Sequence, residues 1–126
     1  MTEIKRVLVV EDDEDILDVL KNIFLEEGFE VYTAVDGLDG FEKFKANKPD
    51  IVFADIVMPK LDGNQLAIKI KELSPSTPII LVSGRFTDLL DRHYDGELKC
   101  DQVLYKPFTR IDILQSIALF NSGKDG

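Results

Sequence analysis

The stretch from Ile51 to Pro59 reads IVFADIVMP, and the residues before Asp55 are apolar and rich in β-branched and aromatic side chains. A short run of this kind, closed soon afterwards by a proline, is typical of a strand that is buried on both faces. Such a strand belongs in the middle of a parallel sheet. It ends at Asp55, and open α/β sheets bind their ligands at the carboxyl ends of their strands. Asp55 is therefore the first candidate for a reactive side chain.

Other strands and helices alternate around this stretch. Composition and length predict further strands over residues 6–10, 29–33, 79–82 and 103–105. Helical spacing of apolar residues predicts helices after Glu11–Asp13, after Asp36–Gly37, after Gly63, over Thr87–Tyr94 and around 111–118. This alternation predicts βαβ units with right-handed crossovers. We therefore expect an α/β fold, a three-layer doubly wound domain. The half-polar strand 29–33 should lie at an edge of its sheet.

The charge balance bears on the kind of partner. The chain of 126 residues has 15 Lys and Arg against 24 Asp and Glu, a net charge of −9. Direct binding to nucleic acid is therefore disfavoured, and protein partners are expected. A single cysteine excludes an internal disulfide, and with a single histidine it excludes a zinc site built from Cys and His.

Length and hydrophobicity limit the organisation of the chain. The length suits one domain with its own core, which we place at residues 1–120, followed by a flexible tail at 121–126. No apolar run approaches the roughly 18 residues that a membrane helix needs, and the amino terminus has no secretory pattern. We therefore expect a soluble, cytoplasmic protein that does not contact a membrane.

Polar side chains follow four of the predicted strands. Glu11 and Asp12 follow the first, Asp55 ends the third, Ser83 follows the fourth and Lys106 follows the fifth. Because parallel strands all end at one edge of the sheet, these groups should gather there. Crowded carboxylates repel one another, and a divalent cation such as Mg²⁺ relieves that repulsion. A carboxylate, a cation, an ammonium and a hydroxyl together suit phosphoryl transfer.

Four segments in this order resemble the receiver domain of bacterial two-component response regulators of the chemotaxis-regulator type. They are Val9–Asp13, Asp55–Gly63, Val82–Gly84 and Lys106–Phe108, which together span nearly the whole chain. The resemblance implies a flavodoxin-like (βα)5 fold with a five-stranded parallel sheet in the order 2-1-3-4-5.

The resemblance also implies a phosphorylation site and a metal site. Asp55 would accept a phosphoryl group from a phosphohistidine on a sensor histidine kinase or a histidine phosphotransfer protein. Glu11 and Asp12 would bind Mg²⁺, directly or through water, together with Asp55 and the backbone carbonyl of Val57. The domain would catalyse only its own phosphorylation and dephosphorylation, and it would act on an unknown downstream protein through protein–protein contacts.

Two further side chains would respond to the phosphoryl group. The resemblance implies that Ser83 hydrogen-bonds a phosphoryl oxygen, that Lys106 pairs with Asp55 or its phosphate, and that the Lys106–Pro107 peptide is cis. The pattern departs at Val103, where family members usually have Tyr or Phe as part of the switch. Tyr105 lies two residues further on, hence on the same face of its strand. We therefore expect altered coupling, or a role for Tyr105.

Other functions fit parts of the same sequence. Acids at 11–13 could simply cap a helix, and Ser83 could belong to a turn. An enzyme that hydrolyses phosphate esters through an aspartyl-phosphate would need a second acid shortly after Asp55, where Val57 stands. A flavodoxin-like cofactor binder would need a phosphate-binding loop after the first strand, and that loop is acidic. A pseudo-receiver that binds partners without phosphate is the remaining alternative.

Overall fold

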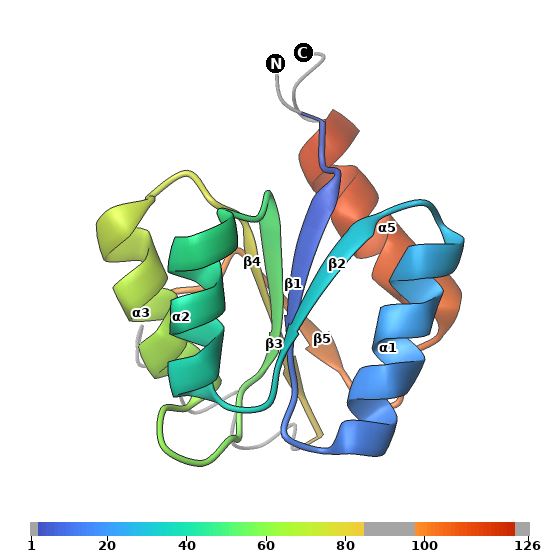
Figure 1. The fold of residues 1–126 in the computed structure, drawn as a ribbon. Coiled ribbons are helices and arrows are strands. Elements are labelled where there is room, and N and C mark those ends of the chain that lie inside the picture. Colours follow the sequence, from blue (N-terminus) through green and yellow to red (C-terminus); the bar gives the residue numbers. More distant parts are fainter. Residues whose placement is uncertain (1–2, 85–97, 123–126) are drawn as a thin grey trace.

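The computed structural model describes residues 3–84 and 98–122. Along the chain these form β1 Arg6–Val10, α1 Glu14–Glu26, β2 Glu30–Ala34, α2 Gly37–Asn47, β3 Ile51–Asp55, α3 Gly63–Leu73, β4 Ile79–Ser83, β5 Gln102–Tyr105 and α5 Arg110–Ser122 (Figure 1). The helix predicted over Thr87–Tyr94 lies outside the described residues. The other predicted helices and all five predicted strands are present. The strand bounds differ by at most one residue, and the last helix is longer than predicted.

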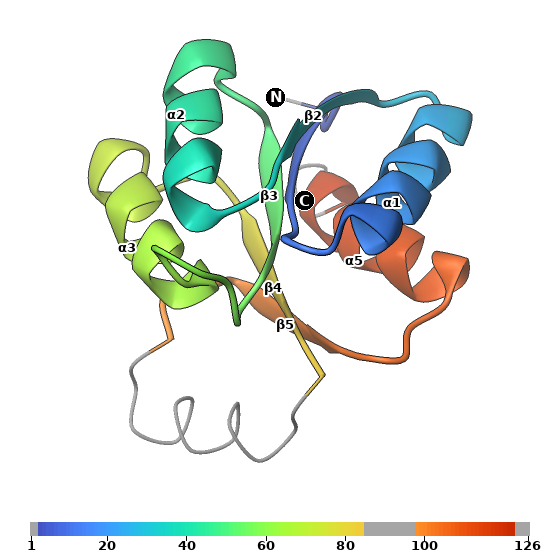
Figure 2. The same cartoon turned by 60° about the horizontal axis from the view of Figure 1, so that its bottom comes forward.

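The strands form one parallel sheet in the order β2-β1-β3-β4-β5. The predicted doubly wound fold and its strand order are confirmed. β3 is buried along its whole length in the centre of the sheet, and β2 lies at an edge, as its polar residues predicted. The carboxyl ends of the strands point to the lower side of Figure 1, which comes forward in Figure 2.

Helices cover both faces of the sheet, so successive strand residues enter different cores. Val7 and Val9 pack with Leu17, Phe24 and other side chains of α1 and α5. The alternate residues of β1, Leu8 and Val10, pack with side chains of α2 and α3 such as Phe44 and Ile70. In Figure 1, α1 and α5 lie on one side of the sheet and α2 and α3 on the other. This double burial explains why the central strands are apolar without alternation.

Aspartates begin the three helices that follow β1, β2 and β3. Asp13, Asp36 and Asp62 are the N-caps of α1, α2 and α3, and their carboxylates accept hydrogen bonds from backbone N–H groups of the first turn. These acids satisfy N–H groups that have no partner inside the helix. At the end of α1, Gly28 adopts a positive φ of 91°, which a glycine tolerates best.

The last helix differs from its predicted extent. α5 continues through Ser122, so Asn121 and Ser122 belong to the helix and not to the tail predicted to start at residue 121. The Asn121 side chain accepts a hydrogen bond from the Ile4 N–H at 2.8 Å and so joins the end of the chain to its beginning. Among the described residues, no helix has the length and apolar character required to cross a membrane.

Candidate functional site

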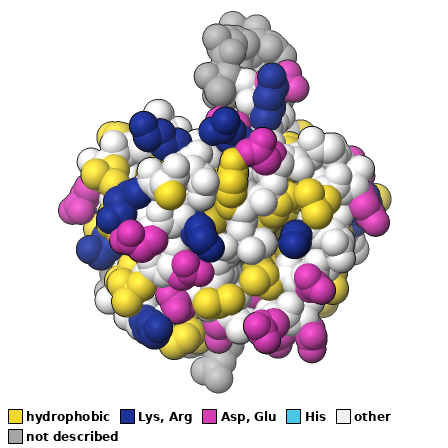
Figure 3. Space-filling model, viewed as in Figure 1, with side chains coloured by type: hydrophobic (Ala, Val, Ile, Leu, Met, Phe, Trp, Pro, Cys, Tyr) yellow, Lys and Arg dark blue, Asp and Glu magenta, His cyan; other side chains and the backbone are white. Residues whose placement is uncertain are grey.

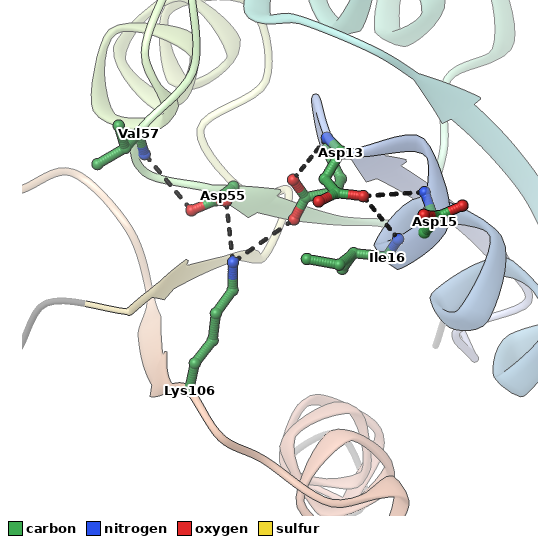
Figure 4. A network of polar contacts seen from close by, with 7 residues as sticks. Asp13, Asp15, Ile16, Asp55, Val57 and Lys106 are labelled. Carbon is green, nitrogen blue, oxygen red and sulfur yellow. Dashed lines mark hydrogen bonds and ion pairs between the residues drawn. The ribbon is translucent and has the colours of Figure 1, made fainter.

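Asp55 lies at the carboxyl end of the central strand and is 9% exposed. Its Oδ2 accepts a hydrogen bond from Lys106 Nζ at 3.1 Å, and its Oδ1 lies 3.4 Å from the backbone N–H of Val57 (Figure 4). Val57 itself is exposed beside this carboxylate. A strand that is buried along its whole length therefore presents one carboxylate at its end, held by an ammonium group.

Glu11 and Asp12 come to the same place from the neighbouring strand. The backbone N–H of Glu11 donates to the Ala34 carbonyl at 3.0 Å, which extends the pairing of β1 with β2 by one residue. Glu11 is only 3% exposed, and its Oε2 accepts a hydrogen bond from the Asp13 N–H at 3.0 Å. Asp12 is exposed. Asp13 caps α1. Of the three consecutive acids, Glu11 and Asp12 therefore lie at the site, and Asp13 begins the helix.

The pairing of the last two strands brings Lys106 to Asp55. The Lys106 N–H donates to the Ser83 carbonyl at 2.8 Å, directly after β5, and the Lys106–Pro107 peptide is cis as expected. The ammonium lies 3.7 Å from Glu11 Oε1 in addition to its contact with Asp55. Ser83 is 1% exposed and follows Val82, the register partner of Asp55, so it lies at the same edge of the sheet.

The start of α3 packs tightly against the strand that carries Asp55. The Gly63 N–H donates to the Ile56 carbonyl at 2.9 Å. A Cβ atom on Gly63 would lie 2.4 Å from the Asp55 carbonyl oxygen, closer than real contacts allow. Asp62 caps α3 and Gly63 is the first residue of the helix, so this pair has a structural role at the helix entrance. What the sequence did not reveal is that the close approach is to Asp55 itself.

Burial and charge act against each other in this cluster. Burial, and to a smaller degree the nearby Asp55 carboxylate, raises the pKa of Glu11 from 4.5 to about 7, although the Asp13 N–H and the Lys106 ammonium oppose the rise. Partial burial disfavours the Lys106 ammonium, but the carboxylates of Asp55 and Glu11 outweigh it and raise the pKa of Lys106. The three carboxyl groups of Glu11, Asp12 and Asp55 therefore outnumber the ammonium group of Lys106 that contacts them.

The donor atoms fit a small, hard cation. Carboxylate oxygens of Glu11, Asp12 and Asp55 lie within 4.8 Å of one another. Oxygen ligands from a few carboxylates, with room left for water and phosphate oxygens, are the set that Mg²⁺ prefers. The electrostatic cost of placing these carboxylates together gives a cation a physical reason to bind. The residues present are therefore suited to Mg²⁺.

Val103 and Tyr105 lie where the sequence placed them on β5. Val103 is half-buried and packs against the core between the sheet and helices α2 and α3. Tyr105 is 39% exposed and is the register partner of Ser83. It therefore lies nearer than Val103 to the carboxyl ends of the strands, where Asp55 is found. An aliphatic residue thus occupies the inner position, and the aromatic residue is the neighbour of Ser83 on the adjacent strand.

Comparison with known proteins agrees with this architecture. Residues 7–118 match the family described as the response regulator receiver domain. The chain belongs to this family. The receiver domain resembles PilG of Pseudomonas aeruginosa, with 36% identity over 114 residues that cover 89% of this chain and 84% of PilG. It spans 48% of the transcriptional regulatory protein PrrA of Mycobacterium tuberculosis, to which it is 36% identical over 112 residues, or 89% of this chain.

Solved receiver domains share the fold. A response regulator receiver domain from Clostridium thermocellum superposes with a TM-score of 0.87 at 29% identity, covering 96% of this chain and 97% of that one. TrrA from Thermotoga maritima, a response regulator solved in complex with Mg(2+)-BeF, gives a TM-score of 0.79 at 30% identity and covers 91% and 97% of the two chains. Membership in this family implies signalling that depends on phosphorylation.

The structure brings most of the predicted site residues together. The carboxylates of Glu11, Asp12 and Asp55 form one cluster, and Lys106 contacts two of its members. Ser83 and Val57 lie at the same edge, beside the strand end that carries Asp55. Sequence reasoning missed the second contact of Lys106, because nothing in the local sequence indicates that Glu11 turns inward.

Proposed function

We propose that this receiver domain is a phosphorylation-activated switch in which Asp55 is the phosphoacceptor. The observation that carries the proposal is the convergence of Glu11, Asp12, Asp55 and Lys106 at one sheet edge, with Lys106 Nζ 3.1 Å from Asp55. A carboxylate is itself a nucleophile, so the transfer to Asp55 needs no general base.

The chemistry follows from the positions of these side chains. An Asp55 oxygen would form the new bond to phosphorus while the bond to the donor atom breaks, and the donor departs with its electron pair. The Lys106 ammonium, already against Asp55, would pair with a phosphoryl oxygen. The Ser83 hydroxyl would hydrogen-bond another such oxygen once the group is in place.

The proposed metal is Mg²⁺, held by Glu11, Asp12, Asp55 and the backbone carbonyl of Val57. When bound, it would neutralise carboxylate and phosphoryl charge during transfer. Support comes from the carboxylate cluster and from TrrA, which was solved with Mg(2+)-BeF. The role of this chain is to hold the carboxylates in place: the Asp13 N–H fixes Glu11, and the end of β3 fixes Asp55.

The proposed donor is a phosphohistidine on a sensor histidine kinase or a histidine phosphotransfer protein, with output through a protein target. The negative net charge favours protein partners over direct contact with nucleic acid. Hydrolysis of phosphate esters is less well supported, because Val57 occupies the position where a leaving-group acid would be needed. The receiver unit, with α5 running through Ser122, would act in the cytoplasm.

Mass spectrometry after incubation with Mg²⁺ and a small phosphodonor tests the proposal. We expect the mass to increase by one phosphoryl group, in a form that hydroxylamine removes, and Asp55→Asn to abolish the increase. Asp13→Asn is the matched control, because Asp13 caps α1 and an asparagine can cap it as well. Labelling of Asp55→Asn at the wild-type level would rule out Asp55 as the acceptor.

A further inference from the structure

A groove lies between the carboxyl ends of α2 and α3. It is on the side of the sheet where the strands begin, away from Asp55 at the end of β3. It has a volume of about 490 Å³. The buried residues Phe44, Pro49 and Thr77 contribute to its wall, and Leu73 lines it with a side chain that is 59% exposed. An exposed leucine beside buried apolar surface provides a site where another apolar side chain could be removed from water.

Lysines surround this groove and the helix surface next to it. Lys45 and Lys48 line the groove directly. The ammonium groups of Lys45 from α2 and Lys69 from α3 lie 4.7 Å and 5.4 Å from the centre of the Phe41 ring. Lys45 also pairs with Glu42 at 3.0 Å, whereas Lys48 has no ion-pair partner among the described residues. Two helices thus direct several cations to one surface.

This surface has the opposite charge to the chain as a whole. The carboxyl-terminal parts of the two helices with the residue that follows α2, residues 42–48 and 69–73, contain five lysines and two acids, and two of these lysines, Lys43 and Lys71, pair with Asp39 and Asp101. Residues 11–26, by contrast, contain seven acids and one lysine. Figure 3 shows Lys and Arg side chains over the upper ends of α2 and α3, and Asp and Glu side chains near the start of α1. In a chain with a net charge of −9, a local surplus of cations favours a partner segment that carries negative charge.

We infer that the groove between α2 and α3 docks an acidic, amphipathic segment of a partner protein. One apolar side chain of that segment enters between Phe44 and Leu73, and its flanking carboxylates contact Lys45, Lys48 and Lys69. The partner is therefore defined by an apolar residue with acids on both sides.

Helix geometry decides which part of the segment enters the groove. The carboxyl ends of α2 and α3 carry a partial negative charge that repels a carboxylate placed deep in the groove. Their last turns are closed by backbone hydrogen bonds, from Lys48 to the Phe44 carbonyl at 2.9 Å and from Ser74 to the Ile70 carbonyl at 2.7 Å. An uncharged side chain is thus favoured inside, and carboxylates are favoured only at the lysine rim.

The location separates this interaction from the phosphorylation site. Pro49 and Thr77 precede β3 and β4, whereas Asp55 and Ser83 end the same two strands. A partner bound in the groove leaves the Asp55 edge open to a phosphodonor. The inference therefore goes beyond the proposed function and does not depend on it.

Titration by ¹H–¹⁵N NMR tests the inference with a short synthetic peptide in which one leucine and one phenylalanine are flanked by glutamates. We expect saturable shifts at Phe44, Lys48, Leu73 and Thr77, with a Kd of about 0.1 to 1 mM, the range of a small contact. The same peptide with lysines in place of glutamates should give no such shifts. Polyglutamate, which lacks the apolar residues, should bind more weakly.

Charge reversal provides the matched test. The variant K45E/K48E should bind the acidic peptide about tenfold more weakly, because two attractive contacts become repulsive ones. The control variant K5E/K21E changes the net charge equally, at exposed residues that do not line the groove, and should keep most of the affinity. Equal losses in both variants, shifts that map elsewhere, no saturable shifts, or shifts from self-association at the same residues would each overturn the inference.

Discussion

Glu11→Gln should remove a pH-dependent destabilisation of the metal-free receiver domain. Glu11 is 3% exposed, and its pKa rises from 4.5 to about 7, mainly because burial disfavours the carboxylate. The unfolded chain thus loses the Glu11 proton at a lower pH than the folded chain. Between the pKa of Glu11 in the unfolded chain and its pKa in the folded chain, the folded state binds more protons, so the unfolding free energy falls as pH rises. Above the pKa in the folded chain, the whole loss of unfolding free energy is present.

The size of the effect follows from the two pKa values. A rise of about 2.5 in pKa corresponds to about 3 kcal/mol of unfolding free energy at alkaline pH. Most of this change should develop between roughly pH 5 and pH 8. Gln keeps an oxygen that can accept the hydrogen bond from the Asp13 N–H, so the variant removes the charge while preserving that contact.

Urea denaturation in buffers containing EDTA measures this difference. The stability of Glu11→Gln relative to wild type should increase with pH by about the amount given above. Taking the difference cancels the titration of the carboxylates that do not interact with Glu11. Saturating Mg²⁺ should restore stability at alkaline pH in wild type much more than in the variant, because the cation compensates the buried charge. Parallel pH profiles for the two proteins would refute the reasoning.

Substitutions at three other positions test separate parts of the site. Lys106→Met should leave the protein folded and strengthen Mg²⁺ binding a few-fold in calorimetry, because it removes a cation 3.1 Å from Asp55; loss of binding would contradict this. Gly63→Ala should lower the unfolding free energy by about 2 kcal/mol, since its Cβ would lie 2.4 Å from the Asp55 carbonyl oxygen, and unchanged urea unfolding would argue against that contact. Asp62→Ala should cost about 1 kcal/mol through the capping box with Gln65, whereas Asp62→Ser should cost less.

Hydrophobic patterning was sufficient to predict the architecture. Each central strand is a short apolar run, because both of its faces are buried, and each of the first three helices follows an aspartate that caps it. The boundary after α5 was placed too early, because Asn121 is polar and a bond between its side chain and the Ile4 N–H has no local signature.

Candidate site residues could be predicted because they stand directly after strands. Parallel strands end at one edge of a sheet, so Asp55, Ser83 and Lys106 had to lie at the same edge once the strands were recognised. The order of the strands, in contrast, came from the resemblance to receiver domains and not from the residue pattern.

The sequence by itself therefore determined which residues form the sheet, which helices cover it and which polar groups reach its active edge. Only the tertiary structure decided that Lys106 contacts both Asp55 and Glu11, that Glu11 is buried while Asp13 caps a helix, and that Lys45 and Lys69 meet over one Phe41 ring. The physical reason is that local periodicity fixes the elements, whereas side-chain distances depend on strand register and helix packing between residues far apart in the chain.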